Sequence, residues 1–175
     1  PTRMAYKLYV EQMMEEEELP VLQEIALKQR LWSNRFELGK LLREAAEALA
    51  DTTKCLSIAV TDDGYVTYAG AANILEYKEY WDIDTAKAAL KILDDYETLN
   101  RIFQSVIPGE EVYTLIEDEI PVENLKDSAI VFSPFRINDK TGDIAVLGPS
   151  RLNYCKTIPM IKYTKGLLEE LGGSW

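Results

Sequence analysis

The segment Cys55–Ala69, with the sequence CLSIAVTDDGYVTYA, holds two β-prone runs on either side of Asp62-Asp63-Gly64. An Asp-Gly pair between two such runs is a strong hairpin signal, because glycine tolerates the positive φ angle of a tight turn. The segment therefore predicts two antiparallel strands, Cys55–Val60 and Tyr65–Ala69. It also marks the point at which the hydrophobic period changes from helical to strand-like.

The residues before this hairpin have helical periodicity. A short helix is expected over Ala5–Glu18, ending in the acidic run Glu15–Glu18, which would lie in water. A longer helical pattern covers Val21–Ala50, and its phase slips near Ser33-Asn34. This pattern predicts either two helices or one irregular helix. An exposed apolar stripe on it would suit a dimer interface, and packing on the sheet is an equally good interpretation.

The residues that follow the hairpin predict helices again. Gly70–Leu75 is expected to form a short helix or helical turn as the chain leaves the strand. Apolar residues then repeat at steps of three and four from Ala89 to Val106. This spacing predicts one helix that begins at Asp82 or Asp84, either of which can cap it, and that ends before Pro108.

The last third of the chain predicts three strands and a helix. Asn138–Gly142 has the composition of a turn, so the second and third of these strands should pair as antiparallel neighbours. Gly148-Pro149-Ser150 then turns the chain into the final helix, where Pro159 lacks a backbone donor and predicts a kink. The strands are expected at Glu111–Ile116, Ser128–Ser133 and Asp143–Leu147.

The order of these elements predicts an α+β fold in a single body. Strands grouped in hairpins, with helices before, between and after them, indicate one mostly antiparallel sheet of about five strands flanked by helices. The apolar runs in the last strands are unbroken, which is typical of strands covered on both faces. The first helix would form an N-terminal helical arm.

Composition excludes several classes of function. The 175 residues include 30 acidic side chains, 19 basic ones and no histidine, so the net charge is −11. Such a body repels nucleic acid, and it cannot hold a Ser-His-Asp triad or a His-rich zinc site. No apolar run is long enough to span a membrane, and no secretory signal is visible. Cys55 and Cys155 are predicted to be buried as small apolar side chains.

The sequence offers only weak candidates for chemistry. Adjacent carboxylates, for example Asp62-Asp63 and Glu117-Asp118-Glu119, are expected by chance in a chain this acidic, and no glycine spacing fits a phosphate loop. We therefore predict a protein that is not an enzyme and has no cofactor or metal site.

Two further features have a structural and a functional interpretation. Tyr77, Tyr80 and Trp81 would form a recognition surface or line a cavity, although packing at one end of the core is favoured. Arg151 would fix the turn before the last helix or present a charge to a partner, and the structural role is favoured.

Several motifs, taken together, resemble one family. Gly148–Ile158, GPSRLNYCKTI, resembles the C-terminal signature of the HrcA family of heat-inducible transcription repressors, where an IGVIGP strand leads into a TRMDYxRVI helix. Pro1-Thr2 with Ala5–Val10 is similar to the PTxxGYRxYV segment that leaves the family's winged helix. Gly70–Leu75 resembles its G-x-x-N-[IL]-L stretch, Gly109-Glu110-Glu111 its IGEE strand start, and Ser128–Val131 its SxV strand. Structural or regulatory roles are expected for Gly70, Asn73, Gly109, Glu111, Ser128, Gly148, Pro149, Arg151 and Tyr154.

The resemblance implies a GAF-like fold, a homodimer in the cytoplasm, and negative regulation of chaperone operons. It also implies that a winged-helix domain upstream binds an inverted-repeat operator, and that the chaperonin GroEL maintains the active repressor. Residues 1–20 would then be the exit segment of that domain with a linker helix, and residues 21–175 the GAF-like dimerisation and regulatory domain. The helix ending near Ala50 passes almost directly to Cys55, whereas the family normally has a longer middle with an inserted domain, so the chain resembles an abbreviated member.

Two other functions remain open at this stage. A stand-alone GAF-like sensor of a small molecule would need a deep, partly apolar pocket with a few convergent polar groups. A carboxylate-based enzyme would need two acids that face each other in a cleft with divergent pKa values. The dimer interface is expected on Val21–Ala50.

Overall fold

A single antiparallel sheet organises the computed structural model, which describes residues 1–173. The spatial order of the strands is β2-β1-β5-β4-β3, and every neighbouring pair is antiparallel. Helices cover the sheet, so the predicted α+β class with a five-stranded, mostly antiparallel sheet is confirmed. The strands are β1 (Leu56–Thr61), β2 (Val66–Ala69), β3 (Tyr113–Ile116), β4 (Ser128–Ile137) and β5 (Lys140–Pro149).

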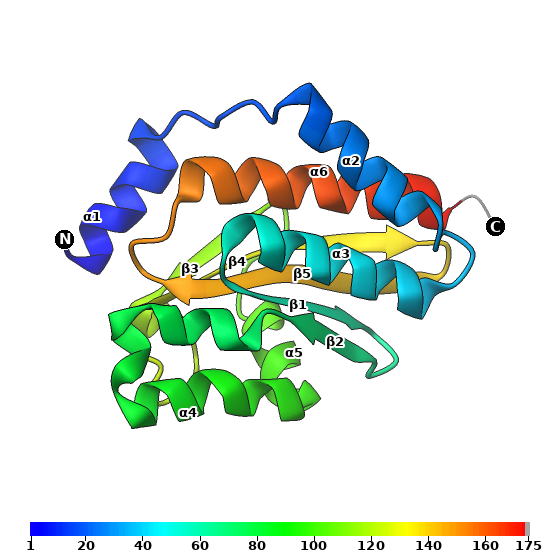
Figure 1. The fold of residues 1–175 in the computed structure, drawn as a ribbon. Coiled ribbons are helices and arrows are strands. Elements are labelled where there is room, and N and C mark those ends of the chain that lie inside the picture. Colours follow the sequence, from blue (N-terminus) through cyan, green and yellow to red (C-terminus); the bar gives the residue numbers. More distant parts are fainter. Residues whose placement is uncertain (174–175) are drawn as a thin grey trace.

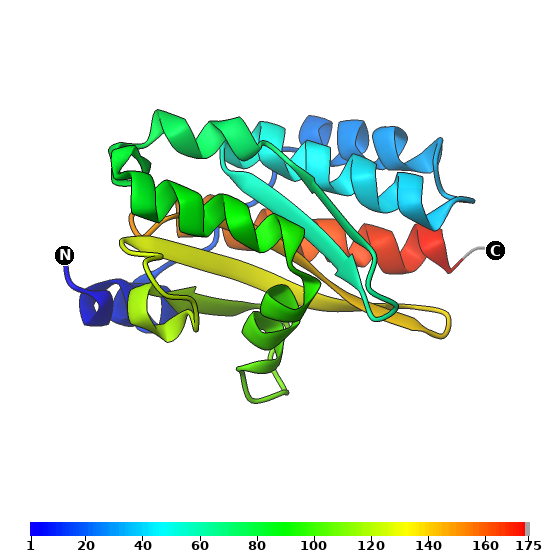
Figure 2. The ribbon, with the colours of Figure 1, turned by 90° about the horizontal axis from the view of Figure 1, so that it is seen from below.

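The helices lie on both faces of this sheet. Helices α3 and α6 pack on one face and α2 lies outside them, whereas α4 and α5 lie on the other face (Figures 1 and 2). Helix α1 stands at one end of the molecule beside β3 (Figure 1). The helices are α1 (Arg3–Leu8), α2 (Val21–Trp32), α3 (Leu38–Thr53), α4 (Ile83–Lys91), α5 (Tyr96–Gln104) and α6 (Tyr154–Gly172), with short 3-10 turns η2 (Ala71–Glu76) and η3 (Lys78–Trp81).

The sheet separates two hydrophobic clusters. In β1, Ile58 belongs to the cluster under α4 and α5, and Ala59 belongs to the cluster under α3 and α6. The same alternation holds in β5 for Ala145 and Val146. Because successive side chains of a strand point to opposite faces, the unbroken apolar runs supply both clusters at once.

Both predicted hairpins are present. Gly64 has φ +90° in the turn between β1 and β2, as the Asp-Gly pair predicts. The hairpin of β4 and β5 is longer than predicted, because these strands extend to Ile137 and from Lys140, and only Asn138 has a positive φ, of 54°. Gly142 therefore lies within β5 and not in the turn. A Cβ there would lie 2.2 Å from the Val60 carbonyl oxygen, so this position requires glycine for close approach.

Two of the predicted helical segments are interrupted. The pattern over Val21–Ala50 forms two helices, α2 and α3, which confirms the first of the two alternatives. The single helix expected from Asp82 to Val106 is wrong, because it stops at Asp95 and restarts as α5. Asp82 does cap α4, as predicted. The Asp95 carboxylate accepts hydrogen bonds from Thr98 N and Thr98 Oγ1 at 3.3 and 2.7 Å, so an unrecognised N-cap restarts the helix.

The N-terminal arm is less helical than predicted. Helix α1 is followed by a π-helical turn over Tyr9–Met13, and the exposed acidic run lies in an extended segment before Pro20, so the expected helix to Glu18 is wrong. Glu17 N donates to the Cys155 carbonyl at 2.9 Å. That carbonyl lacks its usual helical partner because residue 159 is proline, so Pro159 leaves an acceptor free for the arm. The kink at Pro159 stays a prediction.

The two cysteines differ in burial. Cys55 is buried, as predicted, whereas Cys155 is partly exposed, so the expectation for Cys155 is wrong. The Cys155 thiol lies 2.9 Å from Asn153 Oδ1, at the surface beside the arm. None of the helices in the described residues combines the length and the apolar character of a membrane-spanning segment.

Candidate functional site

Seven of the residues that carry the resemblance are brought together at one end of the sheet, where β1 begins and β5 ends. We call this group the signature cluster. It is connected by contacts through Cys55, Tyr77 and Tyr80, which come from different parts of the chain. The signature cluster consists of Gly70, Asn73, Ser128, Gly148, Pro149, Arg151 and Tyr154.

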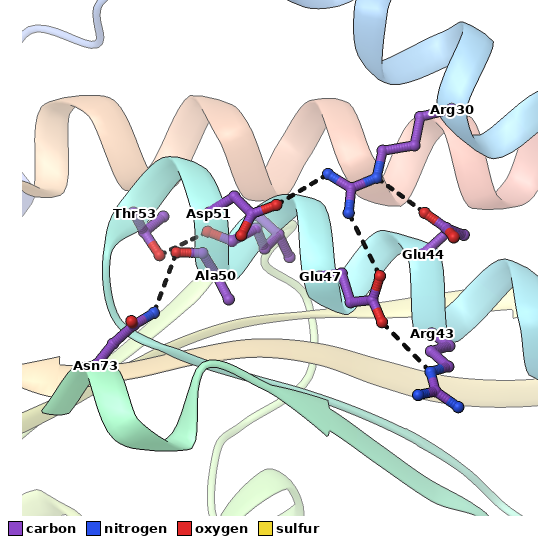
Figure 3. Close-up of polar contacts among 9 residues, drawn as sticks. Arg30, Arg43, Glu44, Glu47, Ala50, Asp51, Thr53 and Asn73 are labelled. Carbon is purple, nitrogen blue, oxygen red and sulfur yellow. Dashed lines mark hydrogen bonds and ion pairs between the residues drawn. The ribbon is translucent and has the colours of Figure 1, made fainter.

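Gly70 and Asn73 join the start of η2 to the end of α3. Asn73 Nδ2 donates to the Cys55 carbonyl at 3.0 Å. It also donates to the Ala50 carbonyl at 3.4 Å, a contact drawn in Figure 3. Ala50 is in the last turn of α3, where carbonyl groups have few donors within the helix. Its carbonyl accepts from Lys54 N and, in addition, from Asn73. Gly70 has φ +76°, and a Cβ on it would lie 2.6 Å from the Cys55 carbonyl oxygen. The backbone therefore approaches too closely for any other residue.

Cys55 is the centre of the signature cluster. A Cβ on Gly148 would lie 2.7 Å from the Cys55 sulfur, so the glycine makes room for the thiol. The Tyr77 hydroxyl donates to the Lys54 carbonyl at 2.9 Å and lies 3.6 Å from the same sulfur. Burial raises the pKa of the Cys55 thiol, which keeps it protonated and unreactive.

Arg151 forms a two-point ion pair with Glu79. Its Nε and Nη2 donate to the two carboxylate oxygens at 2.7 and 3.1 Å, and its guanidinium carbon lies 5.5 Å from the centre of the Tyr77 ring. This fork geometry is specific to arginine and carboxylate. The contact connects η3 to the turn before α6, as expected if Arg151 fixes that turn.

Hydroxyl groups complete the signature cluster. The Ser128 hydroxyl donates to the Lys126 carbonyl at 3.0 Å, which leaves Tyr80 as the donor in the 2.7 Å contact between the two hydroxyls. The Tyr154 hydroxyl donates to the Ser150 carbonyl at 2.6 Å. Both tyrosines are buried, and burial raises the pKa of each phenol. Tyr80 thus packs in the core as favoured, whereas Trp81 is 73% exposed.

Gly109 and Glu111 lie apart from the signature cluster, in the loop before β3. Gly109 has φ +131° and open space where a Cβ would stand. The Glu111 carbonyl accepts from the Ser133 hydroxyl at 2.6 Å, which ties the loop to β4. The residues of the resemblance therefore lie in two separate regions, the signature cluster and the loop before β3. In each region they make contacts that hold the local structure.

Most of the adjacent carboxylates take part in structural contacts. Asp63 pairs with Lys140 at 2.8 Å, and Asp118 pairs with Arg3 at 2.7 Å. Hydrogen bonds from Lys140 and from Thr61 lower the pKa of the Asp63 carboxyl. Residues 1–173 contain no group of three or more His, Cys, Asp or Glu side chains that would hold a metal ion.

An arginine fastens α2 to α3. Figure 3 shows the Arg30 guanidinium between three carboxylates of α3, with distances of 2.8 Å to Glu44, 3.4 Å to Glu47 and 3.1 Å to Asp51. Arg43 donates to the other oxygen of Glu47 at 3.3 Å. The inner face of α2 is held in this way and by two buried leucines.

The outer face of α2 is apolar and exposed. Leu22 is 81% exposed, and its apolar neighbours recur at helical spacing along the same helix and into the loop after it. The Arg35 guanidinium covers part of this face, 3.8 Å from the Trp32 ring centre and 4.2 Å from the Phe36 ring centre. We call the face the α2 stripe; it comprises Val21, Leu22, Ile25, Trp32 and Phe36.

A cavity of about 390 Å³ lies between α5 and the sheet, on the face opposite to α2. Asp143, from β5, is half-buried there, and burial raises the pKa of its carboxyl to about 7. No side chain or backbone group in the described part of the chain donates a hydrogen bond to it. Asp143 belongs to none of the sequence motifs, although an acid directly before the apolar run Ile144–Leu147 is a signal that could have found it.

The comparison with protein families decides the affiliation. The family model described as HrcA protein C terminal domain matches residues 8–158. The chain belongs to the HrcA family. All nine residues of the resemblance lie inside the matched range.

Relatives in the HrcA family are longer than this chain. It is 29% identical over 135 residues to the heat-inducible transcription repressor HrcA of Thermodesulfovibrio yellowstonii, a match that covers 77% of this chain and 36% of that protein. It is 28% identical over 147 residues to the repressor of the same name from Ruminiclostridium cellulolyticum, covering 82% of this chain and 42% of that protein. The chain therefore spans less than half the length of these two relatives.

A solved structure shares the fold of this HrcA domain. It is described as the crystal structure of a hypothetical protein at 2.2 Å resolution, and the superposition has a TM-score of 0.76 with 13% sequence identity. The match covers 99% of this chain and 79% of that chain. At this identity the likeness shows the fold alone.

The close approach at Gly70 predicts a specific loss of stability. Gly70→Ala adds overpacking, about 1–3 kcal/mol, to the strain of a left-handed backbone, about 1–2 kcal/mol. Gly64→Ala is the matched control, because Gly64 also has a positive φ but has no atom within 4 Å of a Cβ. Urea unfolding should show a larger loss for Gly70→Ala. Equal losses in the two variants would contradict a role for the contact with Cys55.

The half-buried Asp143 predicts an unusual dependence of stability on pH. Its pKa is higher in the folded protein than in the unfolded chain, so the contribution is most favourable below the unfolded pKa of 3.8 and is lost as pH rises to about 7. The loss has a slope of up to about 1.4 kcal/mol per pH unit. Urea unfolding of the native protein and of Asp143→Asn, at pH values across this window, should show the variant gaining relative stability as pH rises. A constant difference between the two would contradict the pKa shift.

Proposed function

We propose that this chain is the dimerisation and regulatory domain of a heat-inducible transcription repressor that negatively regulates chaperone operons. The observation that carries the proposal is the family match over residues 8–158, together with the name that its relatives share. In the proposed division of the protein, residues 1–20 leave an upstream winged-helix domain and residues 21–175 form the GAF-like domain. The upstream domain would contact the operator DNA.

The charge of the domain supports this division of labour. The net charge is −11, and ten of the 19 basic side chains form ion pairs with carboxylates within the described residues. Binding to a duplex depends on lysine and arginine that are free to neutralise phosphates. A domain with this balance is therefore suited to assembly and control.

The arm supports the proposed link to an upstream domain. Arg3 pairs with Asp118 at 2.7 Å, and Lys7 Nζ donates to the Thr114 carbonyl of β3. The Thr2 hydroxyl accepts from Ala5 N at 3.2 Å and so caps α1. A domain attached at Pro1 would be placed relative to the sheet by these contacts.

The α2 stripe supports the proposed homodimer. An inverted-repeat operator requires two reading heads related by a two-fold axis, and a two-fold interface uses the same patch on both subunits. The α2 stripe is a large exposed apolar face, and the rest of Val21–Ala50 supplies no comparable one because the apolar residues of α3 are mostly buried. We place the dimer interface on the α2 stripe.

The proposed regulation follows from the resemblance to the family. In it, the chaperonin GroEL in the cytoplasm maintains the active repressor, and heat withdraws the chaperonin by occupying it with unfolded clients. A domain stabilised by only a few kcal/mol would respond to heat and to the chaperonin, because small changes in free energy shift the population of its active form.

The division of labour predicts a difference between the full-length protein and this chain. The full-length protein, translated with its upstream segment, should retard a duplex that carries the inverted repeat upstream of the source organism's chaperone genes. Residues 1–175 alone should give no salt-sensitive complex in the micromolar range, because their charge opposes binding. Gel retardation across a salt series measures both. A tight complex with residues 1–175 would contradict the proposal.

The interface predicts that one charge disrupts the dimer. Leu22→Glu should raise the dimer dissociation constant at least tenfold, since a two-fold interface contains the substitution twice and burying a leucine contributes about 1.5–3 kcal/mol. Ile107→Glu is the control, because Ile107 is 88% exposed outside the α2 stripe. Analytical ultracentrifugation over a concentration series measures both constants. A monomeric native protein, or equal effects of the two variants, would rule out this interface.

A further inference from the structure

The cavity under α5 is built on a row of three side chains across the sheet. Asp143 of β5 is paired in register with Val60 of β1 and with Pro134 of β4. All three line the cavity and share the face that carries α5, because residues directly opposite in a sheet lie on one side. The carboxyl therefore stands between two apolar neighbours on the cavity floor.

One face of α5 forms the opposite wall. Tyr96, Asn100 and Phe103 are spaced by four and three residues, so they lie on the same side of the helix. The Phe103 ring centre lies 4.9 Å from that of Phe132, which in turn lies 5.3 Å from that of Tyr113. The cavity thus combines an aromatic side with one carboxyl and one amide, which is the composition of a small-molecule site.

The charges around the cavity are predominantly negative. Asp62 and Glu169 line it in addition to Asp143, and Arg136 is the one cationic residue among the described residues that line it. Asp62 accepts from the Thr141 hydroxyl at 3.2 Å, and Glu169 accepts from Arg136 N at 2.9 Å. These two acids have partners, whereas Asp143 has none within the described residues.

We propose that this cavity binds a small organic cation, an ammonium group carried on an apolar or aromatic body, with Asp143 as its counter-ion. The Asp143 carboxyl is half-buried and has no donor among the described residues, so a cation that enters the cavity can form an ion pair with it. The partly exposed rings of Tyr96 and Tyr113 line the cavity, so they suit the apolar body and can attract a cation. The volume of about 390 Å³ falls in the usual range of ligand pockets, roughly 300–1,000 Å³.

The chemistry distinguishes this ligand from the alternatives. An anion would meet three carboxylates and one arginine, so its entry is opposed by charge. A divalent metal needs several oxygen ligands close together, and no three acidic side chains in residues 1–173 are placed to hold a metal ion. A neutral apolar ligand would leave the Asp143 carboxyl unpaired. Because the carboxyl is about half protonated near pH 7 in the free protein, cation binding should release a fraction of a proton.

This inference goes beyond the proposed function and does not depend on it. Cation binding is measured on the chain alone, whether or not the domain dimerises or is joined to a DNA-binding head. It also favours the alternative function of a GAF-like small-molecule sensor, because such a sensor needs a partly apolar pocket that contains polar groups.

The test uses three probes that differ only in their head group: 2-phenylethylamine, the neutral 2-phenylethanol and the anionic 3-phenylpropanoate. Isothermal titration calorimetry of residues 1–175 near pH 7 should show saturable binding of the amine alone. Repeating the titration in two buffers with different ionisation enthalpies should show release of up to about half a proton per bound amine.

Two variants test the role of Asp143. Asp143→Asn should weaken amine binding at least tenfold and abolish the proton release, while unfolding measurements show that it remains folded. Asp84→Asn, a change of the same kind on α4 outside the cavity, should leave both unchanged. Equal binding of the alcohol, unchanged affinity in Asp143→Asn, or no saturable binding of the amine would each overturn the proposal.

Discussion

Strand β5 is hydrogen-bonded to β1 on one side and to β4 on the other, and helices cover both of its faces. This position requires apolar side chains pointing both ways, which Ile144–Leu147 supply. The same strand ends at Gly148-Pro149 in the signature cluster and holds Asp143 in the cavity near its other end. The two ends of β5 therefore position the two candidate sites, the cavity near its first residues and the signature cluster at its last residues.

A second layer, formed by the arm and α2, makes polar contacts with α6 in addition to the apolar packing of Leu27 and Leu31 on the core. Lys162 pairs with Glu16 of the arm at 2.7 Å, and Glu170 pairs with Lys28 of α2 at 3.1 Å. The Tyr163 hydroxyl donates to the Glu24 carbonyl at 3.2 Å. Exposed ion pairs contribute only about 0–1 kcal/mol each. The buried leucines therefore contribute more to holding α2 on the core than these exposed ion pairs do.

Local signals predicted the elements that depend on local chemistry. The Asp-Gly turn gave the first hairpin, and Asp82 was recognised as a cap because both depend on neighbouring residues. The interruption at Asp95 was missed, since the apolar period continues through it and conceals a second cap. The end of the first helix was also missed. The segment after that helix is not helical, and Glu17 N donates instead to the carbonyl of Cys155, a residue far away in the sequence.

The sequence by itself determined the α+β class, the pairing of the two hairpins, the family and the negative charge that opposes DNA binding, because each depends on composition, spacing or a local turn. Only the tertiary structure decided that seven signature residues meet at one end of the sheet while Gly109 and Glu111 lie elsewhere. It also decided which face of Val21–Ala50 is exposed, and that Asp143 lines a cavity where no group of residues 1–173 donates to its carboxyl. These facts follow from strand order and helix placement, which bring distant segments together by burial of apolar surface and leave no periodic trace along the chain.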